Sequence, residues 1–238
     1  MAQDVLAVVM ARGGSVGLPG KAVRMLLGKP VIGYTFGHVR ESRLITGTVV
    51  SSDDAEVLRL GREAGLEVIE RPAELATATS ATDPVLRHAV RALYGEGAAR
   101  PAAVVMLYGN VPVRRNGMID RCIEMLFATG CDSVQTVASV GKMHPYWMFD
   151  RKEDGRIRKH VANDVFRRQD LPALFSPTGA VYVMRTEVLL GGEGSPDPHA
   201  FLGKDRRGLV VAAEDSVDID TEKDLWVAEA MLRAEGGK

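Results

Sequence analysis

The stretch "VLAVVMARGGSVGLPGK", residues 5–21, decides the fold of this chain. Six apolar residues, Val5–Met10, run directly into a turn that contains four glycines and the cations Arg12 and Lys21. A short apolar run bounded by turn residues is typical of a buried strand. Glycines in the following turn let backbone N–H groups approach a phosphate without obstruction by Cβ atoms. The stretch therefore predicts a buried first strand followed by a loop that holds a ligand.

The loop does not match the two common phosphate-binding motifs. Its sequence, "RGGSVGLPGKAV", lacks the GxGxxG spacing of a dinucleotide loop, and Ala22 stands where a Walker loop has a magnesium-binding hydroxyl. Arg12 and Lys21 bracket the loop, which favours a triphosphate cradle. From the loop alone, a structural turn with two solvated cations is an equally good interpretation.

The composition describes a globular domain of balanced charge. The 238 residues are 46% hydrophobic, and 30 basic side chains face 31 acidic ones, for a net charge of −1. We therefore expect no nucleic acid and no anionic membrane as a partner. Cys122 and Cys131 lack CxxC spacing and suggest neither a disulfide framework nor a zinc site. Val5–Met10 is too short for a signal peptide or a membrane span, which predicts a cytoplasmic protein.

Short β-branched runs alternate with longer helical patterns along the chain. This alternation predicts βαβ units around a mostly parallel sheet, and hence a single α/β domain over residues 1–238. The expected strands are Val5–Met10, Gly47–Ser51, Glu67–Ile69, Ala103–Leu107, Ser133–Ala138, Ala180–Met184 and Leu209–Ala212. The expected helices are Val31–Glu41, Ala55–Ala64, Pro84–Tyr94, Met118–Ala128 and Glu222–Ala234.

Residues at the predicted helix ends support these helices. Asp53, followed by Glu56, has the pattern of an N-cap with its capping-box partner. Gly65 is placed to end the same helix. Thr221 opens the last helix, whose first turn carries acidic residues where the helix dipole favours them.

The alternation breaks between residues 141 and 176. This segment mixes cations with aromatic residues, and "KEDGRI" within it is typical of a hairpin turn. We expect the segment to leave the sheet as an inserted arm or lid.

Asp218 and Asp220 stand two apart in "SVDIDT", just before the last predicted helix. If this piece is extended, both carboxylates lie on one face. Adjacent carboxylates repel unless a cation compensates, and Mg²⁺ is typically held by one or two carboxylates plus substrate phosphates. The alternative is that Asp220 caps the last helix and Asp218 is solvated.

Five blocks in order resemble the CMP-sialic acid synthetase family, the cytidylyltransferases that activate acidic sugars. The blocks are "MARGGSVGLPGK" (10–21), "RPAELATATSAT" (71–82), "MLYGNVPVR" (106–114), "RRQDLPALFSPTGAVYVMR" (167–185) and "EDSVDIDTEKDL" (214–225). Within the third of these blocks, Gly109, Asn110 and Pro112 also resemble the G-D-x-P pattern of the related CMP-KDO synthetases, with Asn in place of the acid. The resemblance implies a three-layer Rossmann-like nucleotidyltransferase fold with a mostly parallel mixed sheet. It also implies a protruding dimerisation arm and a homodimer whose arms complete the neighbouring acceptor pocket.

The resemblance also assigns roles to individual residues. It implies catalytic roles for Arg12, Lys21, Asp218 and Asp220, the two aspartates as Mg²⁺ ligands. It implies a nucleotide site made by Ala11, Arg12, Gly13, Gly14, Ser15, Lys21, Arg71, Ser80, Tyr108 and Asn110. It implies an acceptor site made by Arg168, Gln169 and Tyr182, with Arg168 on the acceptor's carboxylate. From the residues alone, Tyr182 is as well explained by core packing, and Asn110 by a polar loop.

The chain departs from the family pattern at several positions. Val16 replaces a loop lysine, Ala22 replaces an asparagine expected near the nucleotide, and Ala78 replaces an aspartate. Tyr108 to Val111 rewrite one further block.

These observations predict an enzyme that transfers CMP from CTP to a sialic acid-like or other ulosonic acid, releasing pyrophosphate, with Mg²⁺ as cofactor. No Ser/His/Asp or Cys/His arrangement stands out, in keeping with nucleotidyl transfer, which relies on positioning and charge neutralisation. Two alternatives stay open at this point. One is a catalytically weakened nucleotide or sugar-nucleotide binding protein. The other is a nucleotidyltransferase for a different base, or for another acidic acceptor such as a phosphonate.

Overall fold

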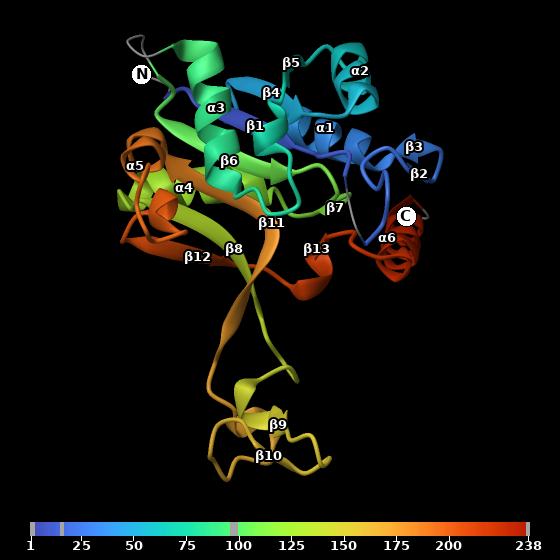
Figure 1. Ribbon diagram of the computed structural model, residues 1–238, viewed down its shortest axis with the longest axis vertical. Helices are drawn as coiled ribbons and strands as arrows, with labels where there is room; N and C mark the ends of the chain where they lie inside the picture. Colours follow the sequence, from blue (N-terminus) through green and yellow to red (C-terminus); the bar gives the residue numbers. More distant parts are fainter. Residues whose placement is uncertain (1–2, 15–16, 96–99, 237–238) are drawn as a thin grey trace.

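The computed structural model describes residues 3–14, 17–95 and 100–236, and its centre is a seven-stranded mixed sheet (Figure 1). The strand order is β12-β8-β11-β6-β1-β4-β5. Of the neighbouring pairs, only the two that involve β11 are antiparallel. The strands are β1 (Val5–Met10), β4 (Gly47–Ser52), β5 (Glu67–Glu70), β6 (Ala103–Tyr108), β8 (Ser133–Ser139), β11 (Phe175–Arg185) and β12 (Arg206–Val210). The predicted α/β fold with a mostly parallel mixed sheet is confirmed.

The helices cover both faces of the sheet, so the molecule has three layers. Alternation along β1 divides its side chains: Val5, Ala7 and Val9 join a core cluster with α1, α2 and α4, while Leu6 and Val8 join one with α3 and α5. This period of two is what a strand buried on both sides requires. The helices are α1 (Val31–Glu41), α2 (Ala55–Glu63), α3 (Thr82–Tyr94), α4 (Met118–Thr129), α5 (Thr186–Gly191) and α6 (Glu222–Gly236).

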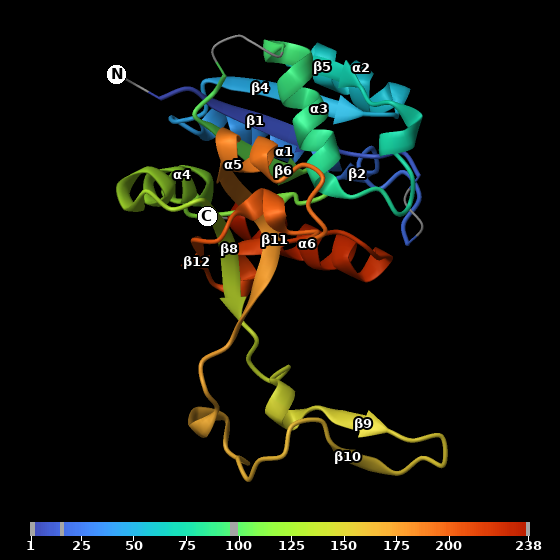
Figure 2. The same ribbon diagram turned by 60° about the vertical axis from the view of Figure 1, so that its left-hand side comes forward.

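The last helix closes one end of the fold over the first loop. A third core cluster joins α6 to Leu18 and Leu26, beside the small hairpin β2 (Met25–Leu26) and β3 (Lys29–Pro30). The chain reaches α6 through β13 (Ser216–Val217), which pairs with β7 (Val113–Arg114). This packing brings the two ends of the chain's sequence, the first loop and the acidic segment, to the same edge of the sheet (Figure 2).

The segment predicted to leave the sheet does so. It projects from the ends of β8 and β11 (Figures 1 and 2) and carries the antiparallel hairpin β9 (Phe149–Arg151) and β10 (Ile157–Lys159), whose turn contains "KEDG". The hairpin prediction is therefore confirmed. Short 3₁₀ turns occur at Ala73–Leu75, Pro145–Trp147, Arg168–Asp170, Ala200–Leu202 and Ala213–Asp215.

Several predicted boundaries are wrong. The last strand of the sheet is Arg206–Val210, not Leu209–Ala212, because parallel pairing to β8 begins at Arg206 opposite Ser133. The antiparallel strand β11 begins at Phe175 rather than Ala180, since it continues into the arm. Helix α3 begins at Thr82 rather than Pro84, which an orphan N–H position in the first turn permits.

One predicted cap is also wrong, and another is confirmed. The N-cap of α2 is Asp54, whose carboxylate accepts hydrogen bonds from the N–H groups of Glu56 and Val57. Asp53 instead accepts from the Gly13 N–H at 3.1 Å. Gly65 ends the helix with φ +68°, as predicted. None of the helices within the described residues is long and apolar enough to cross a membrane.

Candidate active site

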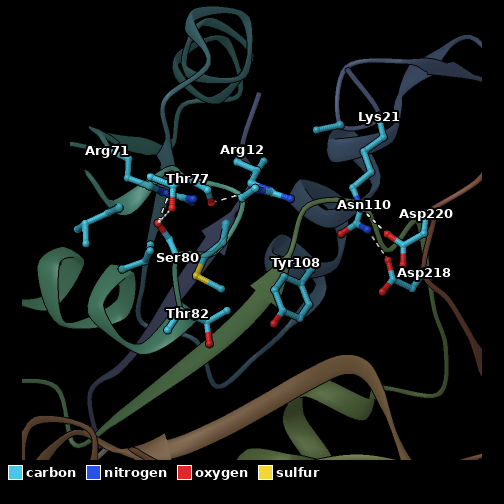
Figure 3. A pocket seen from close by; sticks show the side chains of 17 residues that line it. Arg12, Lys21, Arg71, Thr77, Ser80, Thr82, Tyr108, Asn110, Asp218 and Asp220 are labelled. Carbon is cyan, nitrogen blue, oxygen red and sulfur yellow. Dashed lines mark hydrogen bonds and ion pairs between the residues drawn. The ribbon is translucent and has the colours of Figure 1, made fainter. Parts of the chain in front are cut away.

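A pocket of about 380 Å³ opens at the carboxyl ends of β1 and β6. This is the edge at which open α/β sheets bind ligands. It unites segments distant in sequence: the first loop, the 71–82 segment, the end of β6 and the acidic segment before α6 (Figure 3). The lining residues are Met10, Ala11, Arg12, Lys21, Ala22, Arg71, Leu75, Thr77, Ala78, Ser80, Ala81, Thr82, Val85, Tyr108, Asn110, Asp218 and Asp220.

Arg12 belongs to the side of the pocket formed by the 71–82 segment. Its Nη1 donates to the Thr77 carbonyl at 3.0 Å. Ser80 stabilises the same segment, because its hydroxyl accepts from the Thr77 N–H at 3.0 Å and donates to the Glu74 carbonyl at 3.1 Å. Arg71 is 7% exposed, and its guanidinium donates to the Ser51 carbonyl and hydroxyl at the end of β4. Arg12 is therefore the more exposed cation on this side.

Lys21 and Asp220 face each other on the opposite side. The Lys21 Nζ lies 2.6 Å from Asp220 Oδ1, with the carboxylate side chain 68% exposed. The loop approaches this segment closely at Gly17, where a Cβ atom would lie 2.7 Å from the Asp220 carbonyl oxygen. A side chain at residue 17 would therefore separate the loop from the acidic segment, which explains the glycine.

Asn110 fixes the position of Asp218. Its side-chain nitrogen donates to Asp218 Oδ1 and to the Ile219 carbonyl, the latter at 2.9 Å. Its backbone carbonyl accepts from the Ile219 N–H, also at 2.9 Å. Two strand ends far apart in sequence are thus joined at the residue where the family pattern is rewritten. Asn110 therefore orients the Asp218 carboxylate.

Asp218 experiences an unusual environment for a carboxylate. Burial, with the neighbouring charge of Asp220 as the next cause, raises the pKa of Asp218 to about 6. Lys21 and Arg114 act in the opposite direction but do not compensate fully. A pair of carboxylates that is only partly neutralised by the protein is suited to a bound cation.

The donor set fits Mg²⁺ in particular. Asp218 and Asp220 supply hard oxygen ligands, and they line the same pocket as the cations Arg12 and Lys21. Across residues 3–14, 17–95 and 100–236, no cluster of three or more His, Cys, Asp or Glu side chains is placed to hold a metal. A metal here would take its remaining ligands from water and substrate phosphates, which is the usual pattern for Mg²⁺.

A second pocket of about 490 Å³ adjoins the first. The two share Ser80, Ala81, Thr82 and Tyr108 in their linings. Burial raises the pKa of Tyr108 to about 12. Tyr182 lines the second pocket and is half-buried, and its pKa is raised by burial and by the Asp218 charge. The charge of Asp218 therefore contributes to the raised pKa of Tyr108, which lines both pockets, and of Tyr182, which lines the second.

The remaining predicted site residues are distributed differently. Gly13 and Gly14 belong to the loop but not to the pocket lining, and Ser15, like Val16, lies outside the described residues. Arg168 and Gln169 are exposed in a 3₁₀ turn of the arm, away from both pockets of their own chain. Within one chain the structure does not bring them to Tyr182.

Sequence reasoning missed several lining residues. Thr77, Thr82 and Leu75 line the first pocket because the 71–82 segment folds back over it. Gln135 lines the second pocket, and its signal was available as the one amide side chain among the small and β-branched residues of "SVQTVAS". His199 and Arg206 also line it, and nothing in their local sequence pattern marks them.

Comparison with known proteins identifies the family. The model of the family described as "Cytidylyltransferase" matches residues 6–189. The chain belongs to the cytidylyltransferase family. The matched range includes β1, the loop, the 71–82 segment and β6, which form most of the first pocket.

Individual relatives and a solved structure agree with this membership. The chain is 24% identical to "Post-translational flagellin modification protein B" of Campylobacter coli, over 97% of this chain and 95% of the relative. It is 28% identical to an N-acylneuraminate cytidylyltransferase of Streptococcus agalactiae, over 92% of this chain but only 51% of that protein. The chain thus spans about half the length of the streptococcal relative.

The fold resembles that of a CMP:2-keto-3-deoxy-manno-octonic acid synthetase solved in complex with CTP. The TM-score is 0.74 at 17% identity, over 98% of this chain and 99% of the other. At that identity the likeness concerns the fold.

Proposed function

We propose that this cytidylyltransferase transfers CMP from CTP to an acidic sugar of the ulosonic acid class, with release of pyrophosphate. One observation carries the proposal: a single pocket is lined by three cations and two carboxylates, and it shares lining residues with a second pocket. The relatives support the substrate class, since one is named for N-acylneuraminate and the fold neighbour for 2-keto-3-deoxy-manno-octonic acid and CTP.

The first pocket is the proposed CTP site. Arg12 and Lys21 enter it from opposite sides (Figure 3), so they can neutralise a triphosphate placed between them. Ala22 contributes an apolar contact there, being buried and part of the lining. The cations would stabilise the charge that accumulates as pyrophosphate leaves.

We propose Asp218 and Asp220 as the residues that hold Mg²⁺. The metal, when bound, would neutralise phosphate charge and polarise the phosphorus–oxygen bond. Asn110 keeps Asp218 oriented, and Lys21 keeps Asp220 at the pocket edge until a cation competes for it.

The second pocket is the proposed acceptor site. An acceptor resting against Tyr182 would direct its anomeric hydroxyl toward the shared boundary at Tyr108. The hydroxyl oxygen would form a bond to the α-phosphorus as the bond to the β-phosphate oxygen breaks, and its proton would pass to solvent. The products are the CMP-sugar and pyrophosphate. Adjoining pockets place donor and acceptor next to each other, as the proposed in-line displacement requires.

A nucleotide-binding protein without turnover is not favoured. Arg12, Lys21, Asp218 and Asp220 all line one pocket, so the groups expected for catalysis are together. Phosphate binding alone would not require two adjacent carboxylates.

Pyrophosphate release tests the proposed reaction. The purified chain is incubated with each of the four nucleoside triphosphates, Mg²⁺ and a panel of acidic sugars. We expect pyrophosphate release with CTP and with none of the other three triphosphates, and only when an ulosonic acid is present. Release with another triphosphate, or tight CTP binding without turnover on any acceptor, would contradict the proposal.

Asp220→Asn tests the proposed metal ligands. The substitution keeps side-chain shape but removes one charge, so kcat should fall roughly 100-fold or more, because charged ligands and hydrogen bonds of this kind contribute several kcal/mol. Mg²⁺ binding, followed by titration calorimetry in the presence of CTP, should weaken with it. Glu63→Gln, an exposed carboxylate at the end of α2, is the matched control. Unchanged kcat in Asp220→Asn would overturn the assignment.

We further propose a cytoplasmic homodimer that forms through the arm. CTP is an intracellular substrate, which supports the location. The arm carries a concentration of exposed large apolar side chains, and such patches mark interaction surfaces. They are Met143, Met148, Phe149, Ile157, Phe166, Leu174 and Phe175, of which Phe166 is 82% exposed. Sedimentation equilibrium should give the mass of a dimer for the wild type and of a monomer for Phe166→Asp combined with Ile157→Asp.

A further inference from the structure

The floor of the second pocket is a row of residues across three strands. Tyr182 on β11 pairs with Met106 on β6 on one side and with Gln135 on β8 on the other. Gln135 in turn pairs with Gly208 on β12. Residues in register on neighbouring strands share a face of the sheet. Gly208 adds no side chain to this row and does not line the pocket; a Cβ atom at residue 208 would lie 2.9 Å from the Val137 side chain, which fills that space.

The floor offers neutral polar groups without partners. Among the described residues, neither the Gln135 amide nor the Tyr182 hydroxyl has a hydrogen-bond partner, although both side chains are half-buried. Partly buried polar groups are normally satisfied by protein or water. A sugar hydroxyl or amide resting on the floor would supply those bonds.

The wall next to this floor contributes a guanidinium that is already held in place. Arg206 Nε donates to the Gly203 carbonyl at 2.6 Å, and Nη2 donates to the His199 carbonyl at 3.0 Å. These two bonds fix the plane of the guanidinium. Its Nη1 has no partner within the part of the chain that the structure describes. A preorganised cation of this kind loses little side-chain freedom when it binds an anion.

The charges around the second pocket leave the Nη1 group of Arg206 available. Its Nη2 also donates to Asp197 Oδ2 at 3.4 Å, but the Asp197 carboxylate is 54% exposed and does not line the pocket. The pocket's own acid, Asp83, is paired with Arg87 at 2.6 Å. His199, the other basic residue of the lining, is exposed, precedes the 3₁₀ turn Ala200–Leu202, and has its Nδ1 3.9 Å from Asp197 Oδ1.

We propose that Arg206, assisted by His199, binds the carboxylate of the acidic acceptor within the same chain. The inference rests on the proposed function, and it names the group that selects an acidic sugar. It differs from the expectation that Arg168 does so: Arg168 lies on the arm and lines neither pocket of its own chain, whereas Arg206 lines the second pocket directly. The carboxylate meets Nη1, while the sugar's neutral groups meet Gln135 and Tyr182.

Substitution at Arg206 tests the assignment by separating acceptor affinity from nucleotide affinity. In Arg206→Gln, the acceptor KM should rise roughly 10- to 100-fold, the loss expected for one charge-assisted hydrogen bond. The CTP KM should stay within about twofold, since Arg206 does not line the first pocket. Arg206→Lys keeps the charge and should recover part of the acceptor affinity. Arg207→Gln is the matched control, because the Arg207 guanidinium pairs with Asp205 and lines neither pocket; Arg168→Gln tests the rival assignment.

The methyl ester of the acceptor distinguishes charge recognition from a structural role. Arg206→Gln should discriminate little between acid and ester, whereas the wild type should prefer the acid. Equal weakening of acid and ester would mean that Arg206 only supports the turn at Gly203. Loss of acceptor affinity in Arg168→Gln but not in Arg206→Gln would assign the carboxylate to the arm. Either result overturns the proposal.

Equilibrium binding keeps this inference separate from the proposed reaction. Titration calorimetry with N-acetylneuraminate and with 2-keto-3-deoxy-manno-octonic acid needs no turnover. Binding by the wild type that is lost in Arg206→Gln would support the assignment even if no pyrophosphate were released. Absence of binding for every acid, with the wild type folded and CTP bound, would overturn it.

Discussion

Arg114 is a buried cation whose hydrogen bonds support the loop at the end of β6, beside the first pocket. It is 7% exposed and donates to the carbonyls of Tyr108, Val111 and Ala180 at 2.6, 2.7 and 2.8 Å. Burial lowers its pKa to about 9, so it stays charged at neutral pH. The loop that presents Tyr108 and Asn110 thus takes its shape from a cation that the sequence showed only as the end of "NVPVR". At the scale of single residues, the buried charge of Arg114 therefore sets the positions of pocket residues such as Tyr108 and Asn110.

His38, next to Arg114, gives this scale a pH-dependent prediction. Burial, with Arg114 as the next cause, lowers the pKa of His38 from 6.5 to about 3. Below pH 6.5 the unfolded chain therefore binds a proton that the folded chain excludes, and stability falls as pH drops. Between pH 7.5 and 5.5 this contribution to the free energy of unfolding should fall by about 1.4 kcal/mol.

Urea unfolding of the wild type and of His38→Gln measures this contribution. The free energy of unfolding of the wild type minus that of His38→Gln should decrease by about 1.4 kcal/mol as pH falls from 7.5 to 5.5, because glutamine does not titrate. If the free energies of unfolding of both proteins changed equally with pH, His38 would take up its proton in the folded chain as it does in the unfolded chain, which would contradict the prediction.

At the scale of elements, the two neighbouring acids that follow β4, Asp53 and Asp54, have different roles. Asp54 caps α2, while Asp53 turns to the Gly13 N–H and helps to hold the first loop. Adjacent residues in an extended turn point to opposite sides, so only the backbone geometry decides which one caps. The capping-box pattern predicted a cap correctly but placed it one residue early.

Asp54→Ala should lower the free energy of unfolding by about 1 kcal/mol, the usual value of an N-cap side chain. Asp53→Ala should change it by less than about 0.5 kcal/mol, because Asp53 makes no helix-end contact. Chemical denaturation of both variants gives the comparison directly. Equal losses would contradict the cap seen at Asp54.

Among the elements, strands and helices with strong periodicity were predictable, whereas edges were not. β1 and α1 have the predicted bounds, since their apolar patterns are continuous and their ends carry clear turn residues. β12 shifted because its start depends on pairing with β8, which the local sequence does not encode. The two-residue strands of the β2–β3 hairpin are too short to leave a periodic signal.

At the scale of the whole molecule, the arm is an addition to a finished sheet. Ser139 on β8 and Phe175 on β11 are paired, so the chain leaves and returns at neighbouring positions. The arm's apolar side chains are exposed rather than part of the core clusters. The sheet therefore should not need the arm in order to fold.

Replacing residues 140–174 by Asn-Gly, a turn suited to joining paired antiparallel strands, tests this. The shortened chain should be folded, with a thermal midpoint within about 5 °C of the wild type, because few core contacts are lost. Circular dichroism and sedimentation report folding and mass. A chain that aggregates or melts far earlier would show the arm to be part of the folding unit.

The sequence by itself determined the α/β class, most element positions and the groups Arg12, Lys21, Asp218 and Asp220, because periodicity and motif spacing are local properties. Only the tertiary structure decided that Asn110 holds Asp218, that Gly17 lets the loop reach Asp220, and that Arg206 faces the second pocket. These are relations between strand ends far apart in the chain. Register and packing across the sheet set them, and no local pattern records such distances.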